Sequence, residues 1–205
     1  MDIRDQHQER ILNYWFGTLS EDETPSRDYY TMWFSKRDDI DQYIKINFEE
    51  ELKSAAEGKL KSWDDTPRDA LALIILLDQF SRNMYRGAVK AFSQDSLALE
   101  VCLQGINKGF DKRLHPVESL FFYMPLQHSE SLEMQRKSVE SFSNLERLFP
   151  SPHPLAPLIS GFKEYADKHC VIIERFGRFP HRNEILGRES TLEEIEFLKE
   201  PGSSF

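Results

Sequence analysis

The sequence has few of the features that mark exported or membrane proteins. Its 205 residues include two cysteines, Cys102 and Cys170, which are too few for a disulfide scaffold. The longest apolar run, ALALIILL at residues 70–77, is far shorter than the roughly 20 residues of a membrane-spanning helix. The N-terminal stretch MDIRDQHQER is polar, unlike a signal peptide. We therefore expect a cytoplasmic protein with reduced thiols and no membrane partner.

Positive charge is also scarce. Lysines and arginines number 26 against 35 aspartates and glutamates, which gives a formal net charge of -9. An acidic chain is repelled by phosphate backbones and anionic lipids, so nucleic acid is not expected as a partner. The sequence also lacks a glycine-rich phosphate loop and the metal-ligand spacing His-Glu-x-x-His. We expect no cofactor and no bound metal ion.

Aromatic and charged residues are plentiful. The 15 Phe, 7 Tyr and 3 Trp residues supply much apolar area for a core, while 30% of residues are charged and suit a solvated exterior. This balance is typical of a helix-rich globular protein. No low-complexity linker divides the chain, so we expect one all-helical domain over residues 1–200 and a C-terminal tail over residues 201–205.

Apolar residues recur with the period of an α-helix along most of the chain, and no segment alternates as a strand would. Thr66 followed by Pro67 is a helix start signal, Gly58 and Gly109 are stop signals, and Pro125 ends or kinks a helix. The pattern predicts about eight or nine antiparallel helices. Their expected ranges are residues 5–16, 26–35, 38–57, 66–83, 93–108, 115–124, 131–149 and 157–175, with a short helix after Thr191.

Several longer stretches resemble a known family. They are YWFG (14–17), LLDQFSRNMYRG (76–87), YMPLQHSE (123–130), RFGRFPHRNEILGR (175–188), STLEE (190–194) and PGSSF (201–205). Together they span almost the whole chain, which is similar to a largely bacterial family called domain of unknown function nine hundred and twenty-four. The resemblance implies an all-helical fold like the tetratricopeptide (TPR) superhelices. It implies no reaction and no catalytic residues.

The helix after Thr66 carries the first candidate site. Residues 70–77 are apolar on every side, and the next turn brings four polar side chains: Asp78, Gln79, Arg82 and Asn83. Helical spacing places Asp78 on an inward face, where a carboxylate must be paired because an isolated buried charge is very costly. One interpretation is an Asp78–Arg82 pair that only fastens helices together, and the other is part of a ligand site.

Histidines supply two further candidates. His169 falls on an apolar helical stripe, where a histidine is more often a core residue than a base. His128 and Glu130 flank Ser129 at the junction after Pro125. Ser129 or Ser131 would serve as a helix N-cap, which leaves the role of His128 and Glu130 open. Asp78 or Glu130 is expected to orient a histidine.

The stretch RFGRFPHRN at residues 175–183 is basic and contains no acid. Its polar side chains are Arg175, Arg178, His181, Arg182 and Asn183. The phenylalanines between them tie the stretch to the core, so the arginines should be partly buried. They either form a salt-bridge network, with Asp78, Glu130, Glu174 or Glu184, or receive a carboxylate or phosphate.

Two functional hypotheses follow from these residues. In the first, the arginines, with Gln79, Asn83 and Asn183, bind a small anionic molecule, and His128, His169 or His181 moves a proton in hydrolytic or proton-transfer chemistry. In the second, the chain is a TPR-like module whose concave face binds a protein segment. Convergence of the polar side chains on one place would favour the first, and a broad exposed groove would favour the second.

Overall fold

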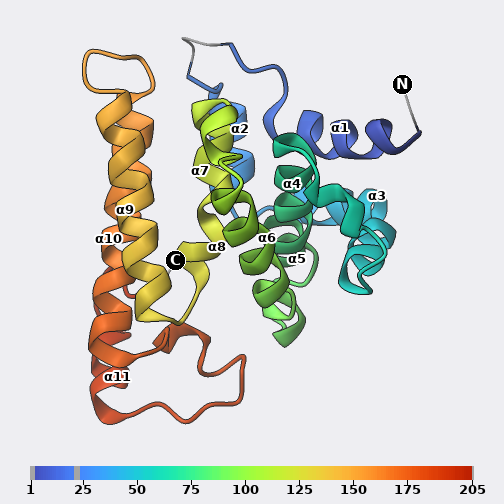
Figure 1. The fold of residues 1–205 in the computed structure, drawn as a ribbon. Coiled ribbons are helices and arrows are strands. Elements are labelled where there is room, and N and C mark those ends of the chain that lie inside the picture. The colour runs from blue at the N-terminus through green and yellow to red at the C-terminus, as the bar shows by residue number, and fades with distance from the viewer. Residues whose placement is uncertain (1–2, 21–23, 205) are drawn as a thin grey trace.

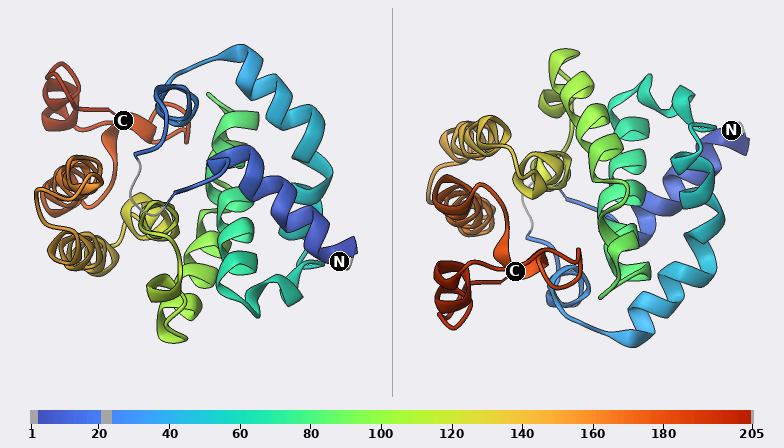
Figure 2. Two further views of the ribbon diagram at one scale, coloured as in Figure 1. Left: turned by 90° about the horizontal axis from the view of Figure 1, so that it is seen from above. Right: turned by 90° about the horizontal axis from the view of Figure 1, so that it is seen from below.

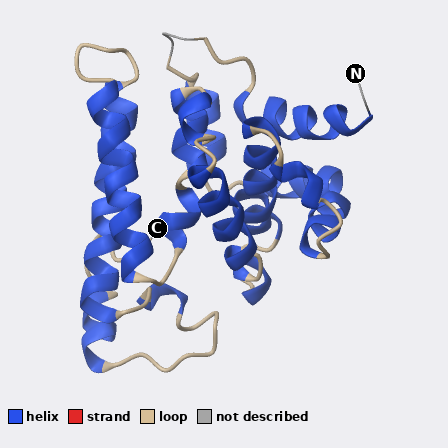
Figure 3. Ribbon diagram, viewed as in Figure 1, coloured by secondary structure: helices blue, strands red, loops and turns tan. Residues whose placement is uncertain are grey.

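Helices make up the regular structure of this protein in the computed structural model, which describes residues 3–20 and 24–204 (Figures 1 and 3). These described ranges contain no strand, so the predicted all-helical fold is confirmed. Observed helix bounds follow the predicted ranges closely. The α-helices are α1 (Ile3–Phe16), α2 (Arg27–Phe34), α3 (Asp38–Ala56), α4 (Pro67–Ile74), α5 (Ser81–Met84), α6 (Asp95–Asn107), α7 (Pro116–Phe122), α8 (Met124–His128), α9 (Leu132–Leu148), α10 (Ala156–Phe176) and α11 (Leu192–Phe197).

The α4 and α5 segments belong to one continuous helix that changes its winding in the middle. The hydroxyl of Thr66 accepts a hydrogen bond from the Asp69 amide at 3.2 Å, as the predicted N-cap requires. Between α4 and α5, residues Ile75–Phe80 form a π-helical turn, η2, and every one of them is buried. The wider turn contains Asp78 and Gln79. Such π-turns are rare and occur frequently at functional sites.

Pro125 acts differently from the prediction that it ends or kinks a helix over residues 115–124. The first helix, α7, already ends at Phe122, and Pro125 lies in the first turn of α8. Proline is tolerated there because its missing N–H would have no partner within the helix. As a result, His128 is the last residue of α8.

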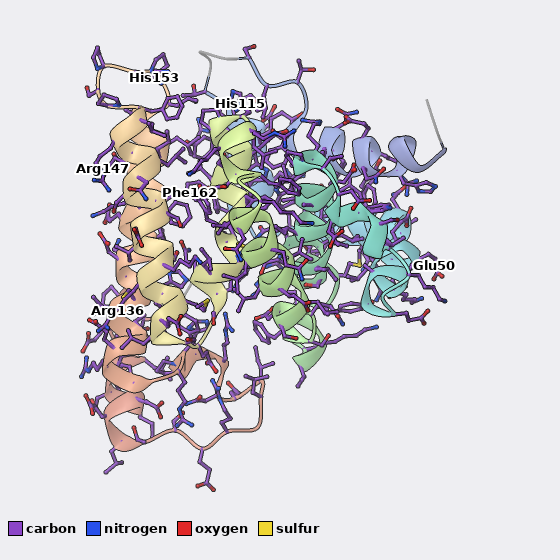
Figure 4. The ribbon with its side chains drawn as sticks, in the orientation of Figure 1. Glu50, His115, Arg136, Arg147, His153 and Phe162 are labelled. Atoms are coloured by element: carbon purple, nitrogen blue, oxygen red, sulfur yellow. The ribbon has the colours of Figure 1, made fainter. Side chains whose placement is uncertain are left out.

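Aromatic rings join the helices in the core. The ring of Trp15 on α1 contacts Phe80 of η2 and Phe121 of α7, at centroid distances of 5.5 and 5.7 Å. Trp33 of α2 packs on Phe121 at 4.8 Å and donates its indole hydrogen to the Trp15 carbonyl. Phe162 of α10 reaches the same ring of Phe121, and Figure 4 shows it between α10 and α7. These edge-to-face contacts fix the helices around η2.

The α9 and α10 helices form a long antiparallel hairpin beside the other helices, as the two views of Figure 2 show. Gly177 ends α10 in the left-handed conformation, with φ of 68°, which glycine adopts without strain. Residues 177–191, here called the C-terminal arm, then leave the lower end of the hairpin and return to α11 (Figure 1). The α11 helix begins with the predicted Thr191–Glu194 capping box.

The predicted tail over residues 201–205 is in part held by the fold. Ser203 is buried, and its hydroxyl donates to the Leu198 carbonyl at 3.1 Å. Phe205 lies outside the described residues. The buried apolar residues form one large cluster between Ile11 and Ala166 and a small one of Ile172, Ile173 and Phe179 under the C-terminal arm.

Two helical glycines provide a test of the packing. A methyl group on Gly105 in α6 would lie 2.4 Å from the Phe122 ring, whereas one on Gly161 in α10 would meet nothing within 4 Å. Gly105→Ala should therefore lower the free energy of unfolding by about 1–3 kcal/mol through overpacking. Gly161→Ala should leave it unchanged or raise it by up to about 1 kcal/mol. Urea unfolding of both variants checks this, and equal effects would contradict the close α6–α7 packing.

Candidate functional site

A fully buried carboxylate, Asp78, lies at the centre of the polar residues that the sequence singled out. One oxygen of Asp78 is 2.8 Å from Nδ1 of His128 and 3.1 Å from Nη1 of Arg82. The other oxygen accepts a hydrogen bond from the side-chain amide of Gln79 at 2.6 Å. The Asp78 side chain is 0% exposed. The predicted inward position of Asp78 and its pairing with Arg82 are both found in the structure.

The contact with Asp78 sets the protonation of His128. Burial raises the pKa of the Asp78 carboxyl, but Arg82, His128 and Gln79 outweigh this effect and hold the pKa below its ordinary value. A carboxylate can only accept, so Nδ1 of His128 carries the hydrogen. Burial and the charge of Arg82 lower the pKa of His128, which favours the neutral ring. Nε2 of that ring is then a hydrogen-bond acceptor and a proton acceptor.

Arg82 connects Asp78 to a second carboxylate, Asp95. The Arg82 guanidinium donates to both oxygens of Asp95, at 2.9 and 3.1 Å, and also to the Asp78 carbonyl at 2.9 Å. Burial lowers the pKa of Arg82, but Asp78 and Asp95 raise it above its ordinary value. Arg82 is thus committed to protein partners. Asp95, the first residue of α6, did not stand out in the sequence because it looks like an ordinary acid in a first helical turn.

The C-terminal arm brings Arg182 to the same place. Its Nη1 lies 3.4 Å from Asp95, and its side chain is 8% exposed. The guanidinium carbon lies over the rings of Phe92 and Phe179, 4.8 and 4.6 Å from their centroids. Burial and the charge of Arg82 lower the pKa of Arg182 to about 10. Asp78, Arg82, Asp95, His128 and Arg182 are called the central cluster below.

One donor of the central cluster is left without a partner. Nε of Arg182 is buried and makes no hydrogen bond to any residue that the structure describes. The cost of an unsatisfied buried donor is about 1–3 kcal/mol, and more for a charged group. A ligand that accepts from this donor would remove the cost.

Two more histidines border the central cluster. The His169 ring lies 6.4 Å from that of His128, and its Nδ1 donates to the Tyr165 carbonyl at 2.7 Å. His169 and His181 both contact the Phe179 ring, with ring centroids 5.4 and 5.6 Å from that of Phe179. Burial lowers the pKa of His169 to about 3 and that of His181 to about 4. Both rings are therefore neutral near pH 7.

Glu130 pairs with Arg188 of the C-terminal arm and not, as predicted, with a histidine. It accepts two hydrogen bonds from Arg188, at 2.7 and 2.9 Å, and one from the Phe179 amide at 2.8 Å. Arg188 also donates to Asn183, which in turn donates to Ser190. These contacts fasten the C-terminal arm. Arg188 ends the stretch RFGRFPHRNEILGR, which was noted in the sequence, but its role could not be read without its partner.

The other predicted site residues lie away from the central cluster. Arg178 donates to both oxygens of Glu194, at 2.6 and 2.8 Å, and Arg175 pairs with Glu193 at 2.8 Å. Asn83 donates to Asp41 on α3 at 2.7 Å. The basic stretch thus divides, since Arg175 and Arg178 hold α11 whereas Arg182 reaches the cluster. The acids that pair with these arginines also differ from those that the sequence suggested.

No group of three or more His, Cys, Asp or Glu side chains in residues 3–20 and 24–204 is arranged to hold a metal ion. Two open hollows on the surface lie elsewhere. One is lined by residues of α2 and its flanks, among them Tyr30 and Phe34, and the other by the loop between α9 and α10. The central cluster is partly exposed at its edge, since Asp95 is 23% exposed and Asp78 is 0% exposed.

The fold and the cluster define an all-helical protein with a buried carboxylate, histidine and arginine centre. A family model described as bacterial protein of unknown function, DUF924, matches residues 11–202. The chain belongs to this family, as its motifs suggested. A solved structure of similar fold is the protein of unknown function ATU0120 from Agrobacterium tumefaciens, with 31% identity and a TM-score of 0.80 over 96% of this chain and 99% of that chain. No curated protein matches.

Within the described part of the chain, none of the helices has the length and apolar character needed to span a bilayer. The cytoplasmic location inferred from the sequence stays a prediction. The likeness to TPR superhelices also stays a prediction.

Removing the central carboxylate tests its role in stability. Asp78→Ala leaves His128 and Arg82 facing a buried gap, so the free energy of unfolding should fall by about 3–5 kcal/mol. Asp39→Ala is the control, because Asp39 pairs with Arg37 on the surface and its loss should matter little. Urea unfolding measures both. An Asp78→Ala protein as stable as the parent would remove Asp78 from the centre of this account.

Proposed function

We propose that the protein binds a small carboxylate- or phosphate-bearing molecule at the central cluster, and that His128 moves a proton there. The observation that carries the proposal is the buried Nε of Arg182, which has no hydrogen-bond partner among the described residues. A guanidinium donor held in this state favours an anionic acceptor. Asp78, Arg82 and Asp95 already have partners in the protein, so Nε of Arg182 is the point in the central cluster where a ligand would bind.

The Asp78–His128 pair supports a role in proton transfer. A carboxylate that accepts from one ring nitrogen keeps the imidazole oriented and stabilises the imidazolium once the other nitrogen takes up a proton. Asp78 is bonded to Nδ1 at 2.8 Å, so Nε2 is the nitrogen that exchanges a proton. His128 is 12% exposed and near the surface, whereas Asp78 lies behind it. Hydrolysis and proton abstraction both suit this arrangement.

Covalent chemistry through a thiol is not favoured. Cys102 and Cys170 are both buried, and burial raises the pKa of each thiol above its ordinary value. A thiol must ionise to act as a nucleophile, so neither cysteine is prepared for attack. We therefore assign the chemistry to His128.

The alternative is a helical module that binds a protein segment. The hollow beside α2 supports it, because Phe34 in that hollow is 55% exposed. However, the other exposed large apolar side chains, such as Ile46 on α3 and Leu192 on α11, belong to different helices. Scattered apolar residues are normal on a soluble surface. We therefore favour the anion site.

Thermal unfolding in different anions tests the proposal. Phosphate, sulfate or a dicarboxylate should raise the midpoint temperature, because a bound ligand raises the free energy of unfolding by about 2.7 kcal/mol at a hundredfold excess over Kd. Chloride at equal ionic strength reports the screening of the net charge of -9. Arg182→Lys keeps the charge but loses the planar donor pair, so it should abolish the specific effect.

Arg178→Lys is the matched control. Arg178 lies in the same basic stretch but is bonded to Glu194, so its replacement should leave the anion response intact. Equal shifts for all anions in the parent and in both variants would mean that the arginines are structural.

A further inference from the structure

We infer that the anionic group bound at Arg182 is a planar carboxylate rather than a phosphoryl group. The inference rests on the proposed function and narrows its ligand class. It depends on which edge of the Arg182 guanidinium is open, on what covers the faces of that group, and on the charge already present around it.

The open edge of Arg182 has the geometry of a carboxylate receptor. Nη1 donates to Asp95 at 3.4 Å, and the unpartnered Nε shares an edge of the planar group with Nη2. The N–H bonds on this edge are parallel and coplanar, and they match the two oxygens of one carboxylate. Nε is buried and has no partner in the described chain, so this edge is held ready for an acceptor.

Aromatic rings restrict the direction from which an acceptor can approach. The guanidinium carbon of Arg182 lies over both Phe92 and Phe179, at less than 5 Å (4.8 and 4.6 Å) from the ring centroids. The rings of Phe92 and Phe179 thus place apolar surface next to the guanidinium group. A carboxylate keeps both oxygens in the guanidinium plane, whereas a tetrahedral group projects its other oxygens out of that plane toward the rings. Burying such oxygens without partners is costly.

The charge of the central cluster also favours a single negative charge. Two arginines and two aspartates balance one another, and His128 is neutral because burial and Arg82 lower its pKa. A bound monoanion is balanced if His128 takes up one proton. A phosphate dianion would leave excess negative charge beside Asp95, which shares Arg182 with the ligand.

The other arginines of the central cluster and of the basic stretch already have carboxylate partners. Phosphate sites combine several arginines, backbone amides or a helix N-terminus. Here Arg82 is bonded to Asp78 and Asp95. The other arginines of the basic stretch, Arg175 and Arg178, are bonded to glutamates near α11. The planar edge of Arg182 is then the arginine donor pair available to a ligand, and its geometry matches a carboxylate.

The test titrates the full-length protein with acetate, methanesulfonate and methylphosphonate at constant ionic strength. Acetate and methanesulfonate carry the same charge but differ in shape, while methylphosphonate adds charge to the tetrahedral shape. The readout is the ¹H–¹⁵N signal of Arg182 Nε, assigned by its loss in Arg182→Lys. We expect acetate to shift this signal saturably and to bind at least tenfold more tightly than either tetrahedral anion.

Variants and outcomes separate this inference from the proposed function. Arg178→Lys should leave acetate binding unchanged, and the titration of the parent stands even if Arg182→Lys does not fold. Equal or tighter binding of methanesulfonate or methylphosphonate at the Arg182 signal would overturn the carboxylate inference while the anion site survives. If none of the three anions moves the Arg182 signal, both the inference and the proposed anion site are wrong.

Discussion

The structure depends on the neutralisation of one buried carboxylate. Asp78 has no exposed surface, and an uncompensated charge in such a place would cost several kcal/mol. Its partners come from different parts of the chain: Arg82 is one turn along the same helix, and His128 ends α8. The π-turn at Ile75–Phe80 places Asp78 and Gln79 together in this position. The aromatic core then packs around the same turn through Phe80.

The same charge balance extends to the C-terminal arm. Asp95 accepts from Arg82 and lies close to Arg182, so it joins the central helices to residues 177–191. Glu130 also fixes the arm, because it pairs with Arg188 and accepts a hydrogen bond from the Phe179 amide. Structural ion pairs thus hold in place the residues that we assign to ligand binding. The two interpretations of the basic stretch apply to different arginines. Arg178 forms a structural ion pair with Glu194, whereas Nε of Arg182 has no hydrogen-bond partner in the described chain.

Local signals made most of the fold predictable from the sequence. Helix starts such as Thr66 and Thr191 and the stop at Gly58 act over a few residues, and the structure has them where expected. Inward placement of Asp78 followed from helical spacing alone. The π-turn was not predictable, because an apolar run such as residues 70–77 is compatible with an α-helix and with a π-helix alike. Partner choice by Arg178, Arg182 and Glu130 was not predictable either, since it depends on acids and bases far away in the chain.

The most direct test of this account is the state of the His128 ring in solution. A long-range ¹H–¹⁵N correlation spectrum, with His128 assigned by its loss in His128→Gln, reports which ring nitrogen carries the hydrogen. Because Asp78 accepts from Nδ1 and burial lowers the pKa of His128, the account predicts a neutral ring protonated at Nδ1 near pH 7. A ring protonated at Nε2 alone, or a charged imidazolium at that pH, would contradict it.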